Sequence, residues 1–323
     1  MKKFIALAAA VSMSTMSICA AASEGYPSKP VTIVLPVSAG SATDGLIRVI
    51  ADKLGKDWLQ SIIVKNEPGA NGILATQTVL RSRADGYTLF ALSTNQVINA
   101  NLYTNLPFNT QKDLKPIARV AMVPMVLCVN PSVPAKTVQQ LIALAKREPG
   151  KLNFGSPGTG STAHLAVEQL KDKTGIKVTH VPYKAVSQAQ TDLIGGQLDF
   201  MFIVPSAAMA QMQAGKLRCL GVGSQERLAQ MPNVPTIAES GVPGFEAIAW
   251  IGLAGQAGLP DAVADDISKE VMHALENKAI QKRIAGLGLV PAGMGRQPFT
   301  AYYNNDFANW HHIIEAAGIR MHN

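Results

Sequence analysis

Positive charge is never concentrated in this chain. The 323 residues carry 29 Lys and Arg against 22 Asp and Glu, a formal net charge of +7, with no run of four basic residues. Proteins that bind nucleic acid gather Lys and Arg on one face or along one helix, so we expect no nucleic-acid partner. A mild, scattered positive excess is more typical of a protein that attracts small anions.

Long hydrophobic runs are also missing, except at the start of the chain. Residues 4–18 are apolar, follow Met1-Lys2-Lys3, and precede Ala20-Ala21-Ala22. A basic start, a short apolar run and a small-residue cleavage site are typical of a secretory signal peptide. The run is too short to span a bilayer. We therefore expect residues 1–22 to be removed and the mature protein to be exported.

Cysteine is scarce. Outside the predicted signal peptide only Cys128 and Cys219 remain, each in a short apolar run that predicts a buried strand. No C-x-x-C spacing or cysteine cluster suggests a metal site. The two thiols could form a disulfide if their strands are neighbours, because an exported protein meets oxidising conditions. Buried free thiols are the alternative that we expect.

Catalytic motifs are absent. The chain contains no G-x-S-x-G and no H-E-x-x-H, and its six histidines are spread without a pattern. A secreted hydrolase, which would need a nucleophile with a base and an orienting acid, is the rival class. We expect no enzyme, no cofactor and no metal.

What is present is an alternation of short β-branched runs and amphipathic segments. Strands are predicted at 31–35, 62–64 and 87–92, with helices at 44–59 and 72–83 between them, and the pattern resumes from residue 125. Residues 109–123 have the character of a connecting region, and helices dominate after residue 261. This order predicts two α/β lobes with mostly parallel sheets flanked by helices. Lobe 1 would comprise 23–123 and 224–323, and lobe 2 the inserted 124–223. Crossings near 120–125 and 222–243 would act as hinges around a cleft.

A glycine-rich turn lies between a predicted strand (151–154) and a predicted helix (161–173). It reads Gly155-Ser156-Pro157-Gly158-Thr159-Gly160-Ser161-Thr162. It has the spacing of a phosphate-binding loop, but Ser161 occupies the place of the required lysine. It also fits G-x-G-x-x-A, yet no acidic residue ends a following strand, which argues against a dinucleotide. Unpaired N–H groups at a helix start favour a carboxylate, and a simple helix cap is the alternative.

A second turn of the same kind follows the first strand. Its residues Ser38, Ala39, Gly40 and Ser41 precede the predicted helix that contains Asp44. Their amides and hydroxyls could meet an oxygen anion. The Asp44 carboxylate could hydrogen-bond and shape the loop, or it could simply cap the helix.

Five further positions are candidates for contact with a ligand. Thr94, Asn95 and Gln96 follow a predicted strand and could meet the distal end of a ligand, with a plain polar loop as the alternative. Tyr183 could line the cleft or pack in the interior. His164 lies in the first turn of its helix and could reach the ligand, although we expect a surface position.

Many blocks in order resemble the periplasmic solute-binding proteins of tripartite tricarboxylate transporters. They include Tyr26-Pro27-Ser28-Lys29-Pro30, Asn66-Glu67-Pro68-Gly69-Ala70-Asn71-Gly72, Ala84-Asp85-Gly86-Tyr87 and Pro149-Gly150-Lys151-Leu152-Asn153-Phe154-Gly155-Ser156. Further blocks are His180-Val181-Pro182-Tyr183-Lys184 and Met231-Pro232-Asn233-Val234-Pro235-Thr236.

The resemblance implies a two-lobed, Venus-flytrap type of binding protein in the periplasm. It also implies a carboxylate held mainly by backbone amides and waters from the two glycine turns, and delivery to a membrane permease of a large and a small subunit. We expect the receptor to be a monomer. A sensor subunit that presents its loaded form to a membrane kinase is an alternative that the sequence does not separate from transport.

Departures from the family pattern bear on the ligand. The first turn usually reads Pro-Gly-Gly before its Asp, whereas here Ser38 and Ser41 supply hydroxyls that could replace bridging waters. An aspartate often follows Phe in the strand near residue 202, and here Ile203 stands in its place. An acid would suit a ligand amine, whereas an apolar residue suits a hydrocarbon face. We therefore expect an aromatic mono- or dicarboxylate, similar to terephthalate.

Overall fold

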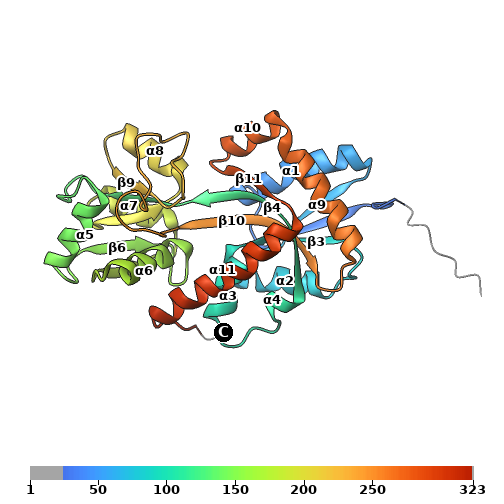
Figure 1. Cartoon of the computed structure of the whole chain (residues 1–323), viewed down its shortest axis with the longest axis horizontal. Helices are drawn as coiled ribbons and strands as arrows, with labels where there is room; N and C mark the ends of the chain where they lie inside the picture. The colour runs from blue at the N-terminus through green and yellow to red at the C-terminus, as the bar shows by residue number, and fades with distance from the viewer. Residues whose placement is uncertain (1–24, 322–323) are drawn as a thin grey trace, which may run out of the picture.

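The chain folds into two lobes, each built on one β-sheet (Figure 1). The structure is a computed structural model that describes residues 25–321, so the predicted signal peptide, 1–22, lies outside the described residues. The strands of the lobe 1 sheet, in spatial order, are β11 (Val290–Met294), β4 (Leu114–Pro124), β10 (Ile248–Gln256), β3 (Thr88–Ser93), β1 (Val31–Leu35) and β2 (Ile62–Asn66). Those of lobe 2 are β7 (Thr179–Pro182), β6 (Asn153–Ser156), β8 (Phe200–Ile203), β5 (Val126–Val129) and β9 (Arg218–Val222).

Both sheets are mixed, which corrects the expectation of mostly parallel sheets. In lobe 1, β1 runs parallel to β2 and β3, but β10 is antiparallel to β3 and β4, and β11 is antiparallel to β4. In lobe 2, β6 is parallel to β7 and β8, whereas β5 is antiparallel to β8 and β9. The antiparallel members are the strands that carry the chain between the lobes or begin or end a lobe. Only the consecutive βαβ units are parallel, as their crossover helices require.

Helices cover both faces of each sheet. Lobe 1 contains α1 (Ala42–Trp58), the 3-10 turn η1 (Ala70–Gly72), α2 (Ile73–Leu80), α3 (Thr94–Leu102), α4 (Thr110–Asp113), α9 (Asp261–Glu276), α10 (Lys278–Gly286) and α11 (Arg296–Ala316). Lobe 2 contains α5 (Val138–Arg147), α6 (Thr162–Thr174), α7 (Val186–Ile194) and α8 (Pro205–Gln213). No helix among residues 25–321 combines the length and the apolar character needed to cross a bilayer.

The alternation of side chains along each strand fills two cores per lobe. In β8, Phe200 and Phe202 join the core beneath α5 and α6, whereas Met201 and Ile203 join the core beneath α7 and α8. Because successive side chains of a strand point to opposite faces, a strand buried on both sides must be apolar throughout. This explains the uninterrupted apolar sequence of β8.

Two interior strands of lobe 1 were not predicted from the sequence. Residues 109–123, expected to be a connection, form α4 and most of the eleven-residue strand β4. Strand β10 lies between the expected crossing segment and the helices expected after residue 261, where we predicted no element. Glycine weakens strand propensity, and β10 contains Gly252. The structure gives the reason for that glycine, because a Cβ there would lie 2.6 Å from the carbonyl oxygen of Ala118 on β4.

The chain crosses between the lobes at two adjacent places. The first crossing is Met125, between β4 and β5, within the range that we expected. The second is Ala247, immediately before β10, because Met125 N donates to Ala247 O (2.9 Å) and Ala247 N donates to Gly223 O (2.8 Å). Residues between Gly223 and Ala247, including Ile237 and Phe245, pack in lobe 2. We therefore propose that the second lobe boundary lies at Ala247 rather than at residue 224.

Cys128 and Cys219 form a disulfide, which corrects the expectation of free thiols. The two residues face each other in the antiparallel pair of β5 and β9. Sequence could place each cysteine in a buried strand, but it could not show that strands 91 residues apart are neighbours. The bond closes a loop that contains most of lobe 2.

Reduction of this disulfide is expected to destabilise lobe 2 by about 2–4 kcal/mol, because a long loop gains conformational freedom in the unfolded chain. Urea unfolding with and without dithiothreitol would measure the effect. The double variant C128A/C219A, which has nothing to reduce, should not respond to dithiothreitol. Equal midpoints for the oxidised and reduced wild-type protein would contradict the expectation.

Candidate functional site

A cavity of about 570 Å³ lies between the two lobes. Lobe 1 lines it from the ends of β1 and β3 and from α3, and lobe 2 lines it from the turn after β6, the start of α7 and the end of β8. None of the lining residues carries a charge. They are Pro36, Val37, Asn71, Ser93, Asn95, Gln96, Ile98, Asn99, Leu102, Met125, Pro157, Thr159, Gly160, Ser161, Thr162, Ala163, Val186, Gln190, Phe202, Ile203, Val204 and Ala249.

The start of α6 supplies the clearest polar feature of the cavity. Ser161 caps the helix, since its Oγ accepts from His164 N and donates to Gly158 O at 2.7 Å. The backbone N–H groups of Thr159, Thr162 and Ala163 have no acceptor among the described residues. All three residues line the cavity. Unpaired N–H groups at a helix start, together with the helix dipole, favour an anion.

Two glycines give this turn its shape. Gly158 has φ 118° and Gly160 has φ 79°, values that favour glycine. A Cβ on Gly160 would collide with Leu102 Cδ2 of α3, so the turn of lobe 2 lies directly against lobe 1. Gly158 itself is not a lining residue of the cavity. The close approach at Gly160 places the free N–H groups at the boundary between the lobes.

His164 lies behind the turn and not on the surface, which corrects that expectation. Its side chain is buried, with only 4% of the residue exposed, and its Nδ1 accepts from Gly160 N at 3.1 Å. Its ring stacks on that of His180, with the two centroids 3.9 Å apart. His164 therefore supports the turn and does not line the cavity.

The residues after β3 begin helix α3 and are not a loop. Thr94 is fully buried, and its Oγ1 accepts from Trp250 N at 2.8 Å, so it does not line the cavity. Asn95 is exposed and does line it. Gln96 is 3% exposed, and its Oε1 accepts from Ser93 N and Ser93 Oγ at 2.9 Å. Its Nε2 has no acceptor in the described part of the chain, which leaves one buried amide donor in the cavity wall.

The turn after β1 is built around Asp44. The Asp44 carboxylate accepts from Gly40 N at 2.9 Å, from Arg48 and from Asn66, while Asp44 N donates to Ser41 Oγ. The hydrogen bond from Arg48, with those from Gly40 and Asn66, lowers the pKa of Asp44 to about 2, although burial opposes the shift. The Asp44 carboxylate therefore shapes the loop, which is one of the two roles that we expected from the sequence.

The remaining part of this turn lies outside the cavity wall. Ser38, Ala39 and Gly40 are exposed and Ser41 is half-buried, and none of the four is among the lining residues, whereas the preceding Pro36 and Val37 are. A ligand contact from these four residues therefore stays a prediction.

Tyr183 and Ile203 have different positions. The Tyr183 hydroxyl donates to Asp192 Oδ2 at 2.7 Å, and its ring packs in the core beneath α7 and α8. Burial and the Asp192 carboxylate raise the pKa of Tyr183 to about 12. Tyr183 is not a lining residue, whereas Ile203 is. Ile203 contributes an apolar surface together with Phe202 and Val186.

Sequence reasoning did not single out several lining residues. Asn99 and Leu102 lie on the face of α3 that turns to the cavity, and Val186 starts α7. No local signal separates these from ordinary helix residues. The spacing of Asn95, Asn99 and Leu102 on one helical face would have been the available signal, had a helix been predicted there.

A second hollow of about 370 Å³ lies between α6 and α11. The charged or titratable side chains in its wall are Asp172, Lys173, Glu246, Tyr302, Asp306 and His312. Burial raises the pKa of Asp306 to about 6, and Trp250 Nε1 donates to its carboxylate at 2.7 Å. Three carboxyl groups would repel an anionic ligand, so we assign the ligand site to the uncharged cavity.

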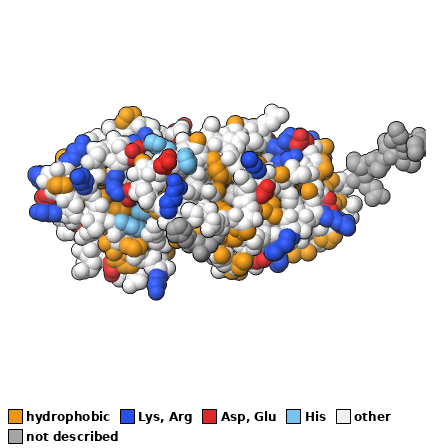
Figure 2. All heavy atoms as spheres, turned by 90° about the horizontal axis from the view of Figure 1, so that it is seen from below, with side chains coloured by type: hydrophobic (Ala, Val, Ile, Leu, Met, Phe, Trp, Pro, Cys, Tyr) orange, Lys and Arg blue, Asp and Glu red, His pale blue; other side chains and the backbone are white. Residues whose placement is uncertain are grey.

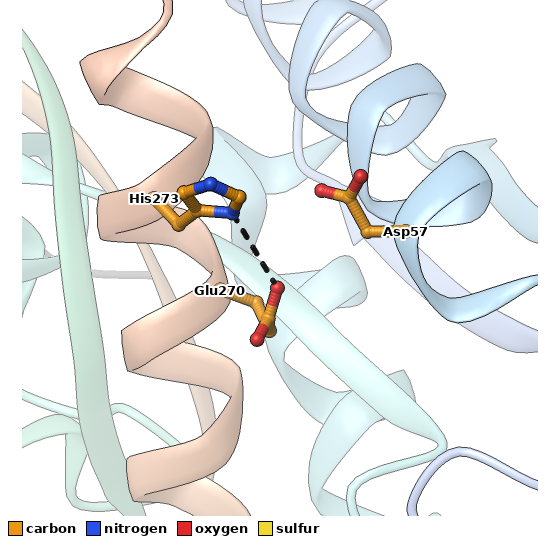
Figure 3. A group of neighbouring side chains, drawn as sticks. All are labelled: Asp57, Glu270 and His273. Carbon is orange, nitrogen blue, oxygen red and sulfur yellow. Dashed lines mark ion pairs between the residues drawn. The ribbon is translucent and has the colours of Figure 1, made fainter.

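One group of potential metal ligands lies on the surface of lobe 1, away from both hollows. Asp57 of α1 faces Glu270 and His273 of α9, with one ligand atom of each within 4.8 Å of the others (Figure 3). Lys53 is already paired with the Asp57 carboxylate, and the His273 side chain is 62% exposed. A cation would have to displace an ammonium group that is already in place, so we assign no metal here.

Comparisons with known proteins cover nearly the whole chain. The family model "Tripartite tricarboxylate transporter family receptor" matches residues 46–319. Protein BugT of Bordetella pertussis is 30% identical over 312 residues, 96% of each chain. The structure of R. palustris Rpa4515 with adipate is 31% identical, has a TM-score of 0.77, and covers 91% of this chain and 99% of that one. MatC from Rhodopseudomonas palustris with bound malate is 26% identical, has a TM-score of 0.71, and covers 90% and 100%. These likenesses confirm the two-lobed α/β fold.

Substitution D44N is expected to lower the free energy of unfolding by about 1–2 kcal/mol at neutral pH, because it removes a buried charge-assisted pair with Arg48. The Asp44 pKa is below its ordinary value of 3.8, so the stabilisation is present above about pH 4 and is lost as the pH falls toward about 2. Urea unfolding across this range would measure both effects.

The control is D52N on the same helix, which removes exposed pairs with Lys56 and Arg283 and should cost less than about 0.5 kcal/mol. Equal losses for the two variants, or a D44N effect that does not shrink in acid, would contradict this account of the turn.

Proposed function

Because the chain belongs to the tripartite tricarboxylate transporter receptor family, we propose that it captures a small organic carboxylate outside the cytoplasm. It would then deliver this ligand to the large and small subunits of a tripartite tricarboxylate-type permease. Members of the family are solute-binding receptors and not enzymes. This chain is therefore a receptor.

One observation carries the choice of a carboxylate. The backbone N–H groups of Thr159, Thr162 and Ala163 have no acceptor among the described residues and lie at the start of α6 in a cavity without charged side chains. Donors that a bound ligand covers need an acceptor, and the dipole of α6 favours a negative one. Neutral donors also keep the desolvation cost of the site low, because no cation has to be buried with the anion.

The distribution of polar and apolar groups supports a ligand with a polar group at each end. Donors come from lobe 2 at the α6 turn and from lobe 1 at Gln96 Nε2 and the Asn95 side chain. The wall also contains apolar side chains, among them Leu102 and Ile203. A dicarboxylate with a hydrocarbon middle matches this order. The adipate bound to Rpa4515 and the malate bound to MatC are both dicarboxylates.

Within this class we propose an aromatic dicarboxylate similar to terephthalate. Ile203 stands where an acid would be needed to pair with a ligand ammonium, and none of the lining residues is Asp or Glu. An amino acid would therefore bury an unpaired positive charge, which is costly. The aromatic ring of Phe202 and the apolar side chain of Ile203 suit the hydrocarbon face of an aromatic ligand.

We also propose that the protein is exported to the periplasm and acts there as a monomer. The disulfide between Cys128 and Cys219 is typical of proteins outside the cytoplasm and supports periplasmic localisation. On the face seen in Figure 2, Lys and Arg side chains are scattered over both lobes and do not form one patch. This distribution agrees with attraction of small anions and not of a polyanion.

Isothermal titration of the mature protein with terephthalate, benzoate, adipate, citrate and glutamate would test the function. We expect terephthalate or adipate to bind with a micromolar or lower Kd and to raise the melting temperature, since a ligand that binds only the folded state stabilises it. Tight binding of glutamate without any response to terephthalate would overturn the aromatic assignment. No binding of any acid would overturn the proposed function itself.

Substitution Q96E would test the cavity. A glutamate keeps the oxygen that accepts from Ser93, but it replaces the free Nε2 donor by a negative oxygen. We expect the affinity for the bound acid to fall by at least about 100-fold, since a lost donor and a buried like charge each cost several kcal/mol. The exposed substitution Q230E adds the same charge outside the cavity and should leave the affinity within about twofold. Equal affinities for Q96E and the wild type would place the ligand elsewhere.

A further inference from the structure

Two stacked histidines hold the α6 turn from behind, and the family likeness assigns them no role. His164 belongs to the first turn of α6 and His180 to β7, and both rings stack with Phe154 of β6. Each histidine is connected by hydrogen bonds to one glycine of the turn. The turn is thus fixed at two points, Gly158 and Gly160, with Thr159 between them.

The hydrogen bonds determine which nitrogen of His164 carries the proton. Gly160 N–H donates to Nδ1, so Nδ1 must present a lone pair. The proton of the neutral ring is therefore on Nε2, which faces Glu168 Oε1 at 3.5 Å. Burial opposes ionisation of Glu168, but hydrogen bonds from His164 and Lys171 hold its pKa below the usual range. An ionised Glu168 accepts the Nε2 proton and keeps this tautomer.

His180 is connected to the turn through Ser156. Ser156 Oγ accepts from Gly158 N at 3.2 Å, and its single proton can go to Gly158 O at 3.0 Å or to His180 Nε2 at 2.7 Å. Burial and the adjacent His164 ring lower the pKa of His180 to about 4, so this ring is neutral at neutral pH.

We propose that neutral His164 is a positioning residue for ligand binding. By accepting from Gly160 N–H it holds the turn in the shape that leaves the amides of Thr159, Thr162 and Ala163 free for the carboxylate. Protonation of Nδ1 would set two N–H groups against each other and release the turn. The receptor therefore binds its ligand less tightly in acid. This inference rests on the proposed function for its ligand.

Few titratable groups face His164, so few groups other than His164 could cause such a pH effect. Glu168 and Lys171 lie on its own helix, and His180 lies on β7. From β6 the neighbour is Phe154, which does not titrate. From α11, His312 pairs with Asp172 at 3.5 Å, two turns farther along α6.

Two substitutions separate the hydrogen bond from simple packing. H164N places a side-chain oxygen near the position of Nδ1 and cannot be protonated there, whereas H164L fills similar space without an acceptor. With terephthalate as the probe, or adipate if terephthalate gives no heat, we expect H164L to weaken binding by about tenfold or more and H164N by less than about threefold. Over the pH range in which NMR shows the His164 ring taking up a proton, wild-type affinity should fall by at least about fivefold while that of H164N stays constant.

A ligand-free measurement keeps this inference separate from the proposed function. Long-range proton–nitrogen NMR spectra of the ¹⁵N-labelled protein at neutral pH should show His164 as the Nε2–H tautomer. The Gly160 amide should shift when His164 is protonated. A Nδ1–H tautomer would overturn the inference even if no acid binds. H164N that binds as poorly as H164L, or a wild-type affinity independent of pH, would overturn it in a receptor that does bind an acid.

Discussion

The cavity between the lobes depends on backbone N–H groups that need a hydrogen-bond acceptor. At the start of α6 the helix cannot satisfy its first amides, and Ser161 serves only one of them, that of His164. In an ordinary loop, water would satisfy the others. Here they line a cavity between two lobes, where an anion can replace the water and gain from the dipole of the helix. Such a site can bind an anionic ligand although none of its lining side chains is charged.

The side chains that support the α6 turn are hydrogen-bonded to the backbone of the turn. Ser156 and Ser161 both bond to Gly158 O, and His164 takes the amide of Gly160. Because each of these groups is already paired inside lobe 2, none competes for the ligand. The turn after β1 is similar, because the Asp44 carboxylate already accepts hydrogen bonds from Gly40, Arg48 and Asn66. Titratable groups therefore shape the binding turns from behind and do not enter the cavity.

The joining of the lobes gives the cavity its two walls. Met125 and Ala247 lie side by side and are hydrogen-bonded, so that both crossings pass through one narrow region. A Cβ at Gly223 would lie 2.7 Å from the carbonyl oxygen of Ala247, which explains a glycine at this place. Helix α11 also extends from lobe 1 to α6 of lobe 2, as Figure 1 shows. Relative motion of the lobes must act on these few contacts.

The sequence by itself determined the local features, because strand patterns, helix caps and glycine turns depend on neighbouring residues. It located the turn at Gly158 to Thr162 and the general α/β order, and its motif blocks indicated the family. It could not show that β10 inserts between β3 and β4, that Cys128 meets Cys219, or that Thr94 is buried by Trp250. Each of these is a contact between residues far apart in the chain. Only the tertiary structure decides such contacts, since the return of the chain from lobe 2 sets which strands become neighbours and which side chains are left facing the cavity.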